Sequence, residues 1–143
     1  MALNIGDVLQ QLKSICSTTG VGFETHIIRD FRNSFLDKGR FPRVFVQCTG
    51  FELLRTDGDK NGVGTYQITV YAKSEKDPYG ENALLDAWEY ATELHDTLTG
   101  YVWVQQQGRV DGISVMNPLL DKANKVWIQG ITITFRMYSY ITT

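Results

Sequence analysis

Apolar residues near the start of the chain recur at intervals of three and four, which places them on one face of a helix. They are Ile5, Val8, Leu9, Leu12, Ile15 and Cys16. Asn4 is a suitable N-cap, and Asp7 lies in the first turn, where a carboxylate interacts favourably with the helix dipole. The segment STTG, which ends at Gly20, provides a helix C-terminus. We therefore predict a first helix that packs on a sheet.

A second helical pattern ends at Gly100 and begins either at Asp77 and Pro78 or at Asn82. Its apolar stripe at 3.6-residue spacing contains Leu84, Trp88, Ala91, His95 and Leu98. Acidic residues occupy roughly the opposite side, and we call them the acidic face: Asp86, Glu89, Glu93 and Asp96. The pattern predicts an amphipathic helix in which His95 is a hydrogen-bonded boundary residue rather than a catalytic base.

The other patterned segments alternate with a period of two, as strands do. The candidate strands are residues 23–29, 43–57, 64–73, 101–107, 112–116 and 125–141. In the last strand the apolar positions change parity at Gly130, which predicts a β-bulge there. This strand would be about 50 Å long at roughly 3.3 Å per residue, so we expect one end to project beyond the core or to pair with something else.

The segment LLRTDGDKNGVGTYQI (53–68) partly matches a calcium-binding EF-hand loop. Asp57, Asp59, Asn61 and Gly62 stand at positions 1, 3, 5 and 6, but position 12 is Ile68 where an EF-hand needs a bidentate acid. The flanks have strand periodicity, and Asp, Asn and Gly are also the residues that tight hairpin turns select. We therefore predict the tip of a long β-hairpin here and no calcium site.

The bulk composition fits an ordinary globular domain, with 143 residues, 43% of them hydrophobic and 21% charged. A net charge of −2 gives no broad attraction to nucleic acid or to an anionic membrane. Apolar runs are too short for a membrane span, and the N-terminus lacks a signal-peptide pattern, so we expect a cytoplasmic product. The patterns together predict one domain over residues 1–143 with an α+β fold. It would contain a mixed, mainly antiparallel β-sheet covered by two main helices, a long β-hairpin and a long C-terminal strand.

Residue types that carry catalysis or bind metals are few and scattered. Cys16, Cys48, His26 and His95 lack the short spacings of zinc sites, and we expect both cysteines to be buried and inert. The sequence contains no glycine-flanked serine elbow and no phosphate-binding glycine motif. We therefore predict no enzymatic activity, no cofactor and no metal.

Residues 29–43, which we call the basic loop, carry unbalanced positive charge. Five basic residues face only Asp30 and Asp37: Arg29, Arg32, Lys38, Arg40 and Arg43. An irregular charged connection of this length is uncommon unless it has a function. In a monomer the basic loop and the acidic face would both be solvated surfaces. In a closed ring, head-to-tail contacts place two different patches of one chain together, and complementary charges then set orientation and register. Both surfaces are therefore candidate subunit or partner interfaces.

The order of predicted elements and the chain length resemble the tail terminator proteins of long-tailed bacteriophages. The resemblance runs from NIGDVLQQLKSI (4–15) to WIQGITITFRMYSY (127–140), and its most suggestive part is YQITVYAKSEKDPYGENALLDAWEYATELHDTL (66–98). It rests on layout, without a short signature motif. It implies an α+β fold whose sheet is covered by helices, and six copies in a ring on the last ring of the tail tube, or of tube and sheath.

Such a ring would end tail polymerisation and present a surface to the neck or head-completion proteins for head–tail joining. The resemblance implies assembly in the host cytoplasm and a final location in the virion tail or neck, without membrane contact. DNA would only pass through the channel. Because strong phosphate contacts would retard that passage, we expect the basic loop to contact protein.

Three further readings stay open besides a tail terminator. The first is another head–tail connector or neck adaptor protein. The second is a small ligand-binding α+β domain in which Trp88, Trp103 and Trp127 line a pocket, although tryptophans in such a chain are more often core and interface anchors. An enzyme whose site is dispersed along the sequence is a third.

Overall fold

The structure is a computed structural model of the chain, and it describes residues 5–18, 23–37, 40–56, 59–74, 79–101, 103, 106–121 and 126–141. The helices are α1 (Ile5–Thr18) and α2 (Glu81–Gly100), with a short 3₁₀ turn, η1 (Asn33–Leu36). The strands are β1 (Glu24–Ile27), β2 (Arg43–Thr56), β3 (Asp59–Lys73), β4 (Gln106–Val115), β5 (Leu119–Asp121) and β6 (Val126–Ile141). The α+β prediction is confirmed.

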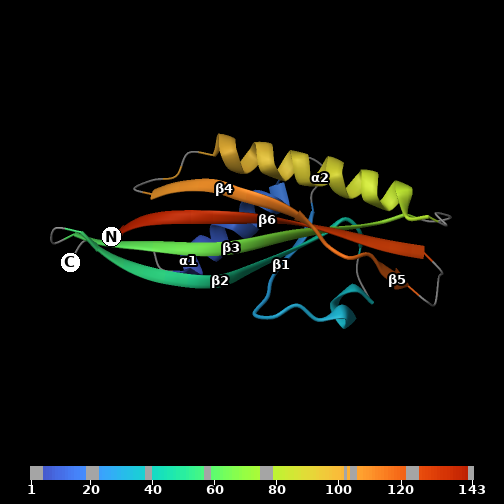
Figure 1. Cartoon of the computed structure of the whole chain (residues 1–143), viewed down its shortest axis with the longest axis horizontal. Coiled ribbons are helices and arrows are strands. Elements are labelled where there is room, and N and C mark those ends of the chain that lie inside the picture. Colours follow the sequence, from blue (N-terminus) through green and yellow to red (C-terminus); the bar gives the residue numbers. More distant parts are fainter. Residues whose placement is uncertain are drawn as a thin grey trace.

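The strands form one sheet in the order β1-β2-β3-β6-β4, and β5 pairs with β6 beyond the end of β4 (Figure 1). Strands β1 and β2 are parallel, while the other described pairs are antiparallel. β6 therefore lies inside the sheet, between β3 on one side and β4 and β5 on the other. In the part of the chain that the structure describes, β1 forms one edge of the sheet, and β4 with β5 forms the other.

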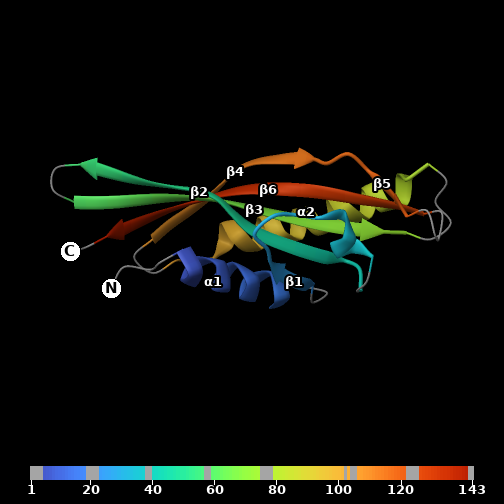
Figure 2. The ribbon, with the colours of Figure 1, turned by 90° about the horizontal axis from the view of Figure 1, so that it is seen from below.

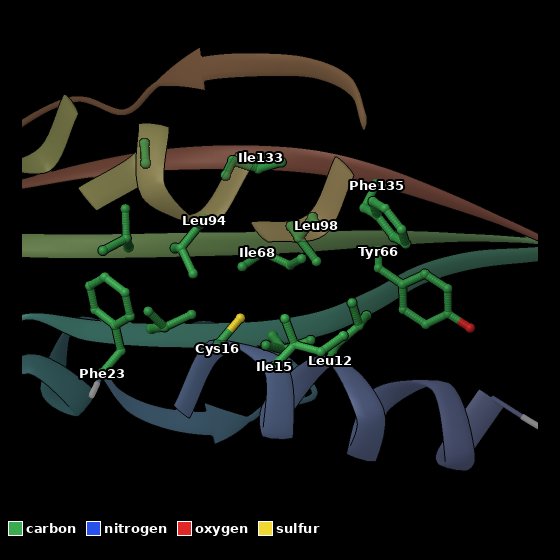
Figure 3. Packing of buried hydrophobic residues seen from close by; sticks show 14 of the residues in the cluster. Leu12, Ile15, Cys16, Phe23, Tyr66, Ile68, Leu94, Leu98, Ile133 and Phe135 are labelled. Carbon is green, nitrogen blue, oxygen red and sulfur yellow. The ribbon is translucent and has the colours of Figure 1, made fainter. Parts of the chain in front are cut away.

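Both helices cover the same face of the sheet, α1 over β1 and β2, and α2 mainly over β3, β6 and β4. The main core lies between the two helices on one side and the sheet on the other, and side chains from both helices pack against the sheet (Figure 3). The strand predicted at residues 64–73 is part of β3, and its alternate residues Tyr66, Ile68, Val70 and Ala72 are all buried on the helix-covered face. Burying a large apolar side chain contributes about 1.5–3 kcal/mol, so this face holds the helices in place.

A second, smaller core lies on the opposite face, under the connection from β1 to β2. Leu36 of η1 packs there with Phe45, Tyr71 and Ile128, which come from three neighbouring strands. These strands are therefore buried on both sides at this end of the sheet. A one-sided alternation cannot describe such strands, because apolar residues are then required at every position.

This second core explains the parity change at Gly130, where the predicted β-bulge is wrong. The β3–β6 register runs unbroken through the pair Tyr71 and Gly130. Ile128 packs in the small core, while Ile131 packs in the main core on the other face. The apolar parity changes because β6 contributes to the small core before Gly130 and to the main core after it. Register shifts occur instead in β2, between Cys48 and Gly50, and in β4, between Val110 and Gly112.

The long hairpin of β2 and β3 is confirmed, and with the adjoining ends of β6 and β4 it forms an arm that projects past both helices (Figure 2). The last pair of the hairpin is Thr56 with Asp59, so the turn is shorter than the sequence suggested. Ile68, the residue at the twelfth EF-hand position, is a fully buried strand residue. Both flanks of the loop are strands, as predicted. Asp57, the first EF-hand position, lies outside the described residues.

Helix α2 is rotated relative to the predicted stripe. Its buried residues are Ala83, Ala87, Ala91, Leu94 and Leu98, whereas Trp88 is 40% exposed. Three alanines let the helix axis approach the sheet closely, and the larger residues Leu84, Trp88 and His95 then lie at the side of the contact. The helix begins at Glu81 after Gly80, which has a φ of 76°. Asn82 is therefore inside the helix, and Asp77 and Pro78 lie outside the described residues.

The strands after α2 also differ from the prediction. One strand, β4, replaces the two expected at 101–107 and 112–116, because its pairing with β6 continues through residues 108–111 with a bulge between Val110 and Gly112. The sequence pattern also missed β5. This three-residue strand is attached through its pairing with β6 and through Lys73, whose Nζ lies 2.7 Å from Asp121 Oδ2.

Candidate assembly surfaces

The acidic face lies on the outward side of α2, where Glu89 and Asp96 are exposed and Asp86 and Glu93 are half-buried toward Tyr90. Its four carboxylates are Asp86, Glu89, Glu93 and Asp96, and α2 contains no lysine or arginine. On the flank toward α1, the Tyr90 ring meets Phe23 edge-on with 5.5 Å between centroids. Burial, followed by the nearby carboxylates, raises the pKa of Tyr90. His95 Nδ1 lies 3.1 Å from Asp96 Oδ1, at the boundary position expected from the sequence.

The exposed part of the basic loop consists of three arginines. The Arg29 side chain is 97% exposed, with its Nε 3.9 Å from Asp30, and Arg32 and Arg40 are also exposed. An exposed ion pair at such a distance contributes little to stability, so the Arg29 charge remains directed at solvent. Lys38, the fourth predicted member, lies outside the described residues.

Arg43 has a different role, and the expectation that it belongs to a surface patch is wrong. It is 6% exposed, and its guanidinium lies 5.1 Å from the centre of the Phe45 ring. Its Nη1 donates to the carbonyl oxygen of Phe35, and its Nη2 lies 3.7 Å from Glu24 Oε1. Arg43 is the first residue of β2 and points to the same face as Phe45, two residues later. It therefore fastens the basic loop over the small core.

Glu24 of β1 contacts both Arg43 and the backbone of the basic loop. Its Oε2 accepts a hydrogen bond from the Arg40 backbone N–H at 2.9 Å, and its Oε1 lies 3.1 Å from His26 Nε2. These contacts, with the His26 hydrogen bond first, lower the pKa of the Glu24 carboxyl. No sequence pattern marks Glu24, because Arg40 and Arg43 come close to it only when β1 pairs in parallel with β2.

The acidic face and the basic loop lie on opposite sides of the molecule. Helix α2 packs on β3, β6 and β4, toward the β4 edge, whereas the basic loop joins β1 to β2 at the other edge. Figure 1 shows α2 along one long side of the sheet and the basic loop beyond the other. The two surfaces therefore do not face each other within one chain.

A polar cluster lies on the face of the arm that the helices leave open. Asp111, in the β4 bulge, accepts a hydrogen bond from Arg109 Nε on its Oδ1 at 2.8 Å, and its Oδ2 lies 2.9 Å from Arg136 Nε. The Arg109 guanidinium is 5.6 Å from the centre of the Tyr138 ring. Beside the cluster is a hollow of about 370 Å³ lined by Gly50, Phe51, Glu52, Val63, Thr65, Arg136 and Tyr138. The sequence did not reveal this cluster, because only strand pairing brings residues 111 and 136 together.

The three tryptophans do not line a common pocket, which removes the basis given for a ligand-binding domain. Trp103 packs on Phe135, with 5.9 Å between ring centroids. Trp127 lies eight residues earlier on β6, about 26 Å away along the strand, and packs near Gly80. Trp88 is on the exposed flank of α2. The hollow on the arm contains none of them.

The cysteines and histidines are also separated. Cys16 is buried, and burial raises its pKa to about 12, as expected for an inert thiol. Cys48 is only half-buried, contrary to expectation, with its Sγ 3.5 Å from the Gly50 carbonyl oxygen. Among the described residues, no three His, Cys, Asp or Glu side chains are grouped to hold a metal ion. No helix in this part of the chain is long and apolar enough to cross a membrane.

Comparisons with known proteins do not add a functional assignment. No family model matches the chain, and no curated protein matches it. The functional argument therefore rests on the surfaces described above.

Proposed function

We propose that this chain is a structural assembly protein of a long-tailed bacteriophage, a tail terminator. Six copies form a ring that caps the tail tube, ends tail polymerisation and provides the surface for head–tail joining. Its partners are further copies of itself, the tube protein, the sheath protein where a sheath is present, and a neck or head-completion protein. DNA only passes through the channel.

The observation that carries this proposal is the placement of the acidic face and the basic loop on opposite sides of one sheet. A closed ring needs two different, mutually complementary patches on each subunit, because every contact joins the front of one copy to the back of the next. Long-range attraction between the patches would orient the copies before they dock. The order of elements seen in the structure also agrees with the α+β layout from which the resemblance was argued.

The projecting arm supports the same function. Its strands extend beyond both helices, so a substantial length of sheet has no helix packed on it (Figure 2). Exposed strand surface of this kind suits contact with a large partner such as a tube end. The open face of the arm carries Arg109, Asp111 and Arg136, whose charges are already paired within the chain.

The proposal is tested in two steps with the full chain. Native mass measurements over a wide concentration range, at low and high salt, with negative-stain images, should show closed rings that weaken as salt screens the charges. Polymerising tail-tube protein should then give tubes whose ends carry the ring and stop growing. Tubes that ignore the protein, together with binding to a portal complex instead, would favour the neck adaptor reading.

A pair of charge-matched variants tests the role of the basic loop. Arg32→Glu should weaken ring formation by roughly two- to fivefold per contact, the range for exposed ion pairs. Lys13→Glu changes the charge equally on α1 and should leave ring formation unchanged. Arg43 is unsuitable for this test, because its buried guanidinium supports the fold. Equal behaviour of the two variants would contradict the charge-pairing argument.

A further inference from the structure

An apolar strip runs along the β4–β5 edge of the sheet and is exposed in the isolated chain. Four large apolar residues on it expose 40–52% of their surface: Ile113, Val115, Met116 and Leu120. β4 and β5 pair with consecutive parts of β6, so they lie end to end along the same side of that strand. We call these four residues the edge strip.

Strand register places three members of the edge strip on the helix-covered face. Ile113 lies opposite Ile133, and Val115 lies opposite Ile131. Directly paired residues of antiparallel strands project to the same face, and both β6 isoleucines are in the main core. Leu120 pairs with Trp127, which shares the face of Ile131 by alternation. The strip is therefore the uncovered margin of the main core.

Helix α2 adds Trp88 to this margin. Two residues of a helix are about 200° apart, so Trp88 and Tyr90 lie on opposite flanks of the buried stripe. Tyr90 points toward α1, where it contacts Phe23. Trp88 therefore points toward the β4 edge, and its side chain is 40% exposed there. Glu89, the next residue, already belongs to the acidic face.

The second half of β4 has little of the protection that natural edge strands carry. Edges are commonly shielded by charged residues, prolines or bulges, because their unpaired backbone groups invite association. The bulge and the ion pairs of Asp111 protect the first half. From Gly112 to Val115 the strand contains no charge and no proline. An exposed edge with apolar side chains is a typical protein contact.

We propose that the edge strip and Trp88 form one half of a seam between subunits, and that the occupant is the basic-loop side of a second copy of this chain. This inference deepens the proposed ring and rests on it. The charge of the neighbourhood selects the occupant, since α2 carries no lysine or arginine and its exposed acidic residues are Glu81, Glu89 and Asp96. Asp86 and Glu93 lie on the other flank, near Tyr90. The basic loop presents Arg29, Arg32 and Arg40 at the opposite edge of the sheet.

A self-pairing of two β4 edges would instead bring two α2 helices of like charge together, which is unfavourable. The head-to-tail contact avoids this, because it pairs an acidic, apolar edge with a basic one. The same contact repeats around a ring and leaves no edge strip exposed.

A neighbouring pair of β4 residues provides matched variants. Val115→Lys places a charge in the strip at a side chain that is 52% exposed, so the fold should be retained. Ser114→Lys places the same charge one residue earlier, on the other face of the strand. We expect Val115→Lys to raise the dissociation constant of the assembly at least tenfold, and Ser114→Lys to leave it within about twofold. Far-UV circular dichroism and thermal unfolding of both variants check that each is folded.

Disulfide crosslinking identifies the occupant. In a Cys48→Ser background, Met116→Cys and Asn33→Cys each place one thiol on one side of the proposed seam. A mixture of the two chains should form a mixed disulfide under mild oxidation, and each chain alone should not. A chain carrying both substitutions should form a ladder of crosslinked oligomers. Crosslinks of Met116→Cys with itself would show edge-to-edge pairing and overturn the proposal.

The outcomes separate this inference from the proposed function. Wild-type chain that stays monomeric up to about 1 mM, or rings formed equally by Val115→Lys, would overturn the seam. Val115→Lys rings that still cap tail tubes would leave the tail terminator function standing without the seam. Correct mixed crosslinks in a chain that never binds tube ends would leave the seam standing and remove the terminator function.

Discussion

Gly130 lies in β6 directly opposite Tyr71 of β3, and the tyrosine ring occupies the space that a side chain would need. A β carbon at position 130 would stand 2.6 Å from Tyr71 Cε1 and 3.0 Å from Cδ1. Tyr71 is 4% exposed, and its ring is held by Phe31 at 5.2 Å and Phe45 at 5.8 Å between centroids. The ring cannot move without displacing the small core, so Gly130→Ala should be destabilising.

Two opposing effects determine the size of the loss. Forcing an extra carbon into a packed core costs about 1–3 kcal/mol. Replacing glycine by alanine also restricts the unfolded chain, which returns about 0.4–1 kcal/mol. We therefore expect Gly130→Ala to lower the free energy of unfolding by about 1–2 kcal/mol, or Tm by about 2–8 °C for a domain of this size. Gly130→Val should be worse, because its two methyl groups meet the same ring.

Urea and thermal unfolding followed by far-UV circular dichroism measure the effect. Gly112→Ala is the control, because no atom lies within 4 Å of a β carbon at that position, and its stability should stay within about 0.5 kcal/mol of wild type. In a Tyr71→Leu background, Gly130→Ala should cost less, which a double-mutant cycle detects as coupling. A Gly130→Ala protein as stable as Gly112→Ala would refute the steric argument.

Two further predictions concern single ionisable groups. The lowered pKa of Glu24 means that its contribution to stability is complete above the ordinary glutamate pKa of about 4.3. That contribution disappears as pH falls through the lower folded-state value. Glu24→Gln should therefore be less stable than wild type at pH 7, with a gap that narrows in acid, and a pH-independent gap in urea midpoints would contradict this. The Cys16 thiol, whose pKa is raised to about 12 by burial, should react with a disulfide reagent only when the protein unfolds. The half-buried Cys48 should react first in the native protein. Rapid labelling of the native Cys48→Ser variant would contradict the burial of Cys16.

The local pattern of apolar residues was sufficient to predict a helix or strand where that element has one buried face. The spacing of Val8, Leu12 and Ile15 predicted α1, and the period-two alternation of residues 64–73 predicted a strand that is part of β3. Periodicity works in these places because burial on one side demands apolar residues at the period of the backbone. The same reasoning predicted the long hairpin, since turn residues separate two strand patterns.

Local periodicity gave wrong predictions where a strand packs on both faces, or where the space available at a contact determines which residue is buried. Gly130 was read as a bulge because the small core on the opposite face was not foreseeable from one strand. Trp88 was assigned to the stripe of α2 because it is large and apolar, whereas the sheet accepts the small Ala87 at the point of closest approach. Arg43 was counted as a surface charge because its partners Phe35 and Glu24 belong to other elements.

The sequence by itself determined the α+β class, the hairpin, the acidic face and the position of the charged connection, because each follows from residues close together in the chain. Only the tertiary structure decided which charges are exposed, which edge of the sheet is apolar, and that the acidic and basic surfaces lie on opposite sides. Those properties depend on strand order and register, which bring residues such as Asp111 and Arg136 together from distant segments. Strand order is a choice among non-local pairings, and local periodicity does not encode it.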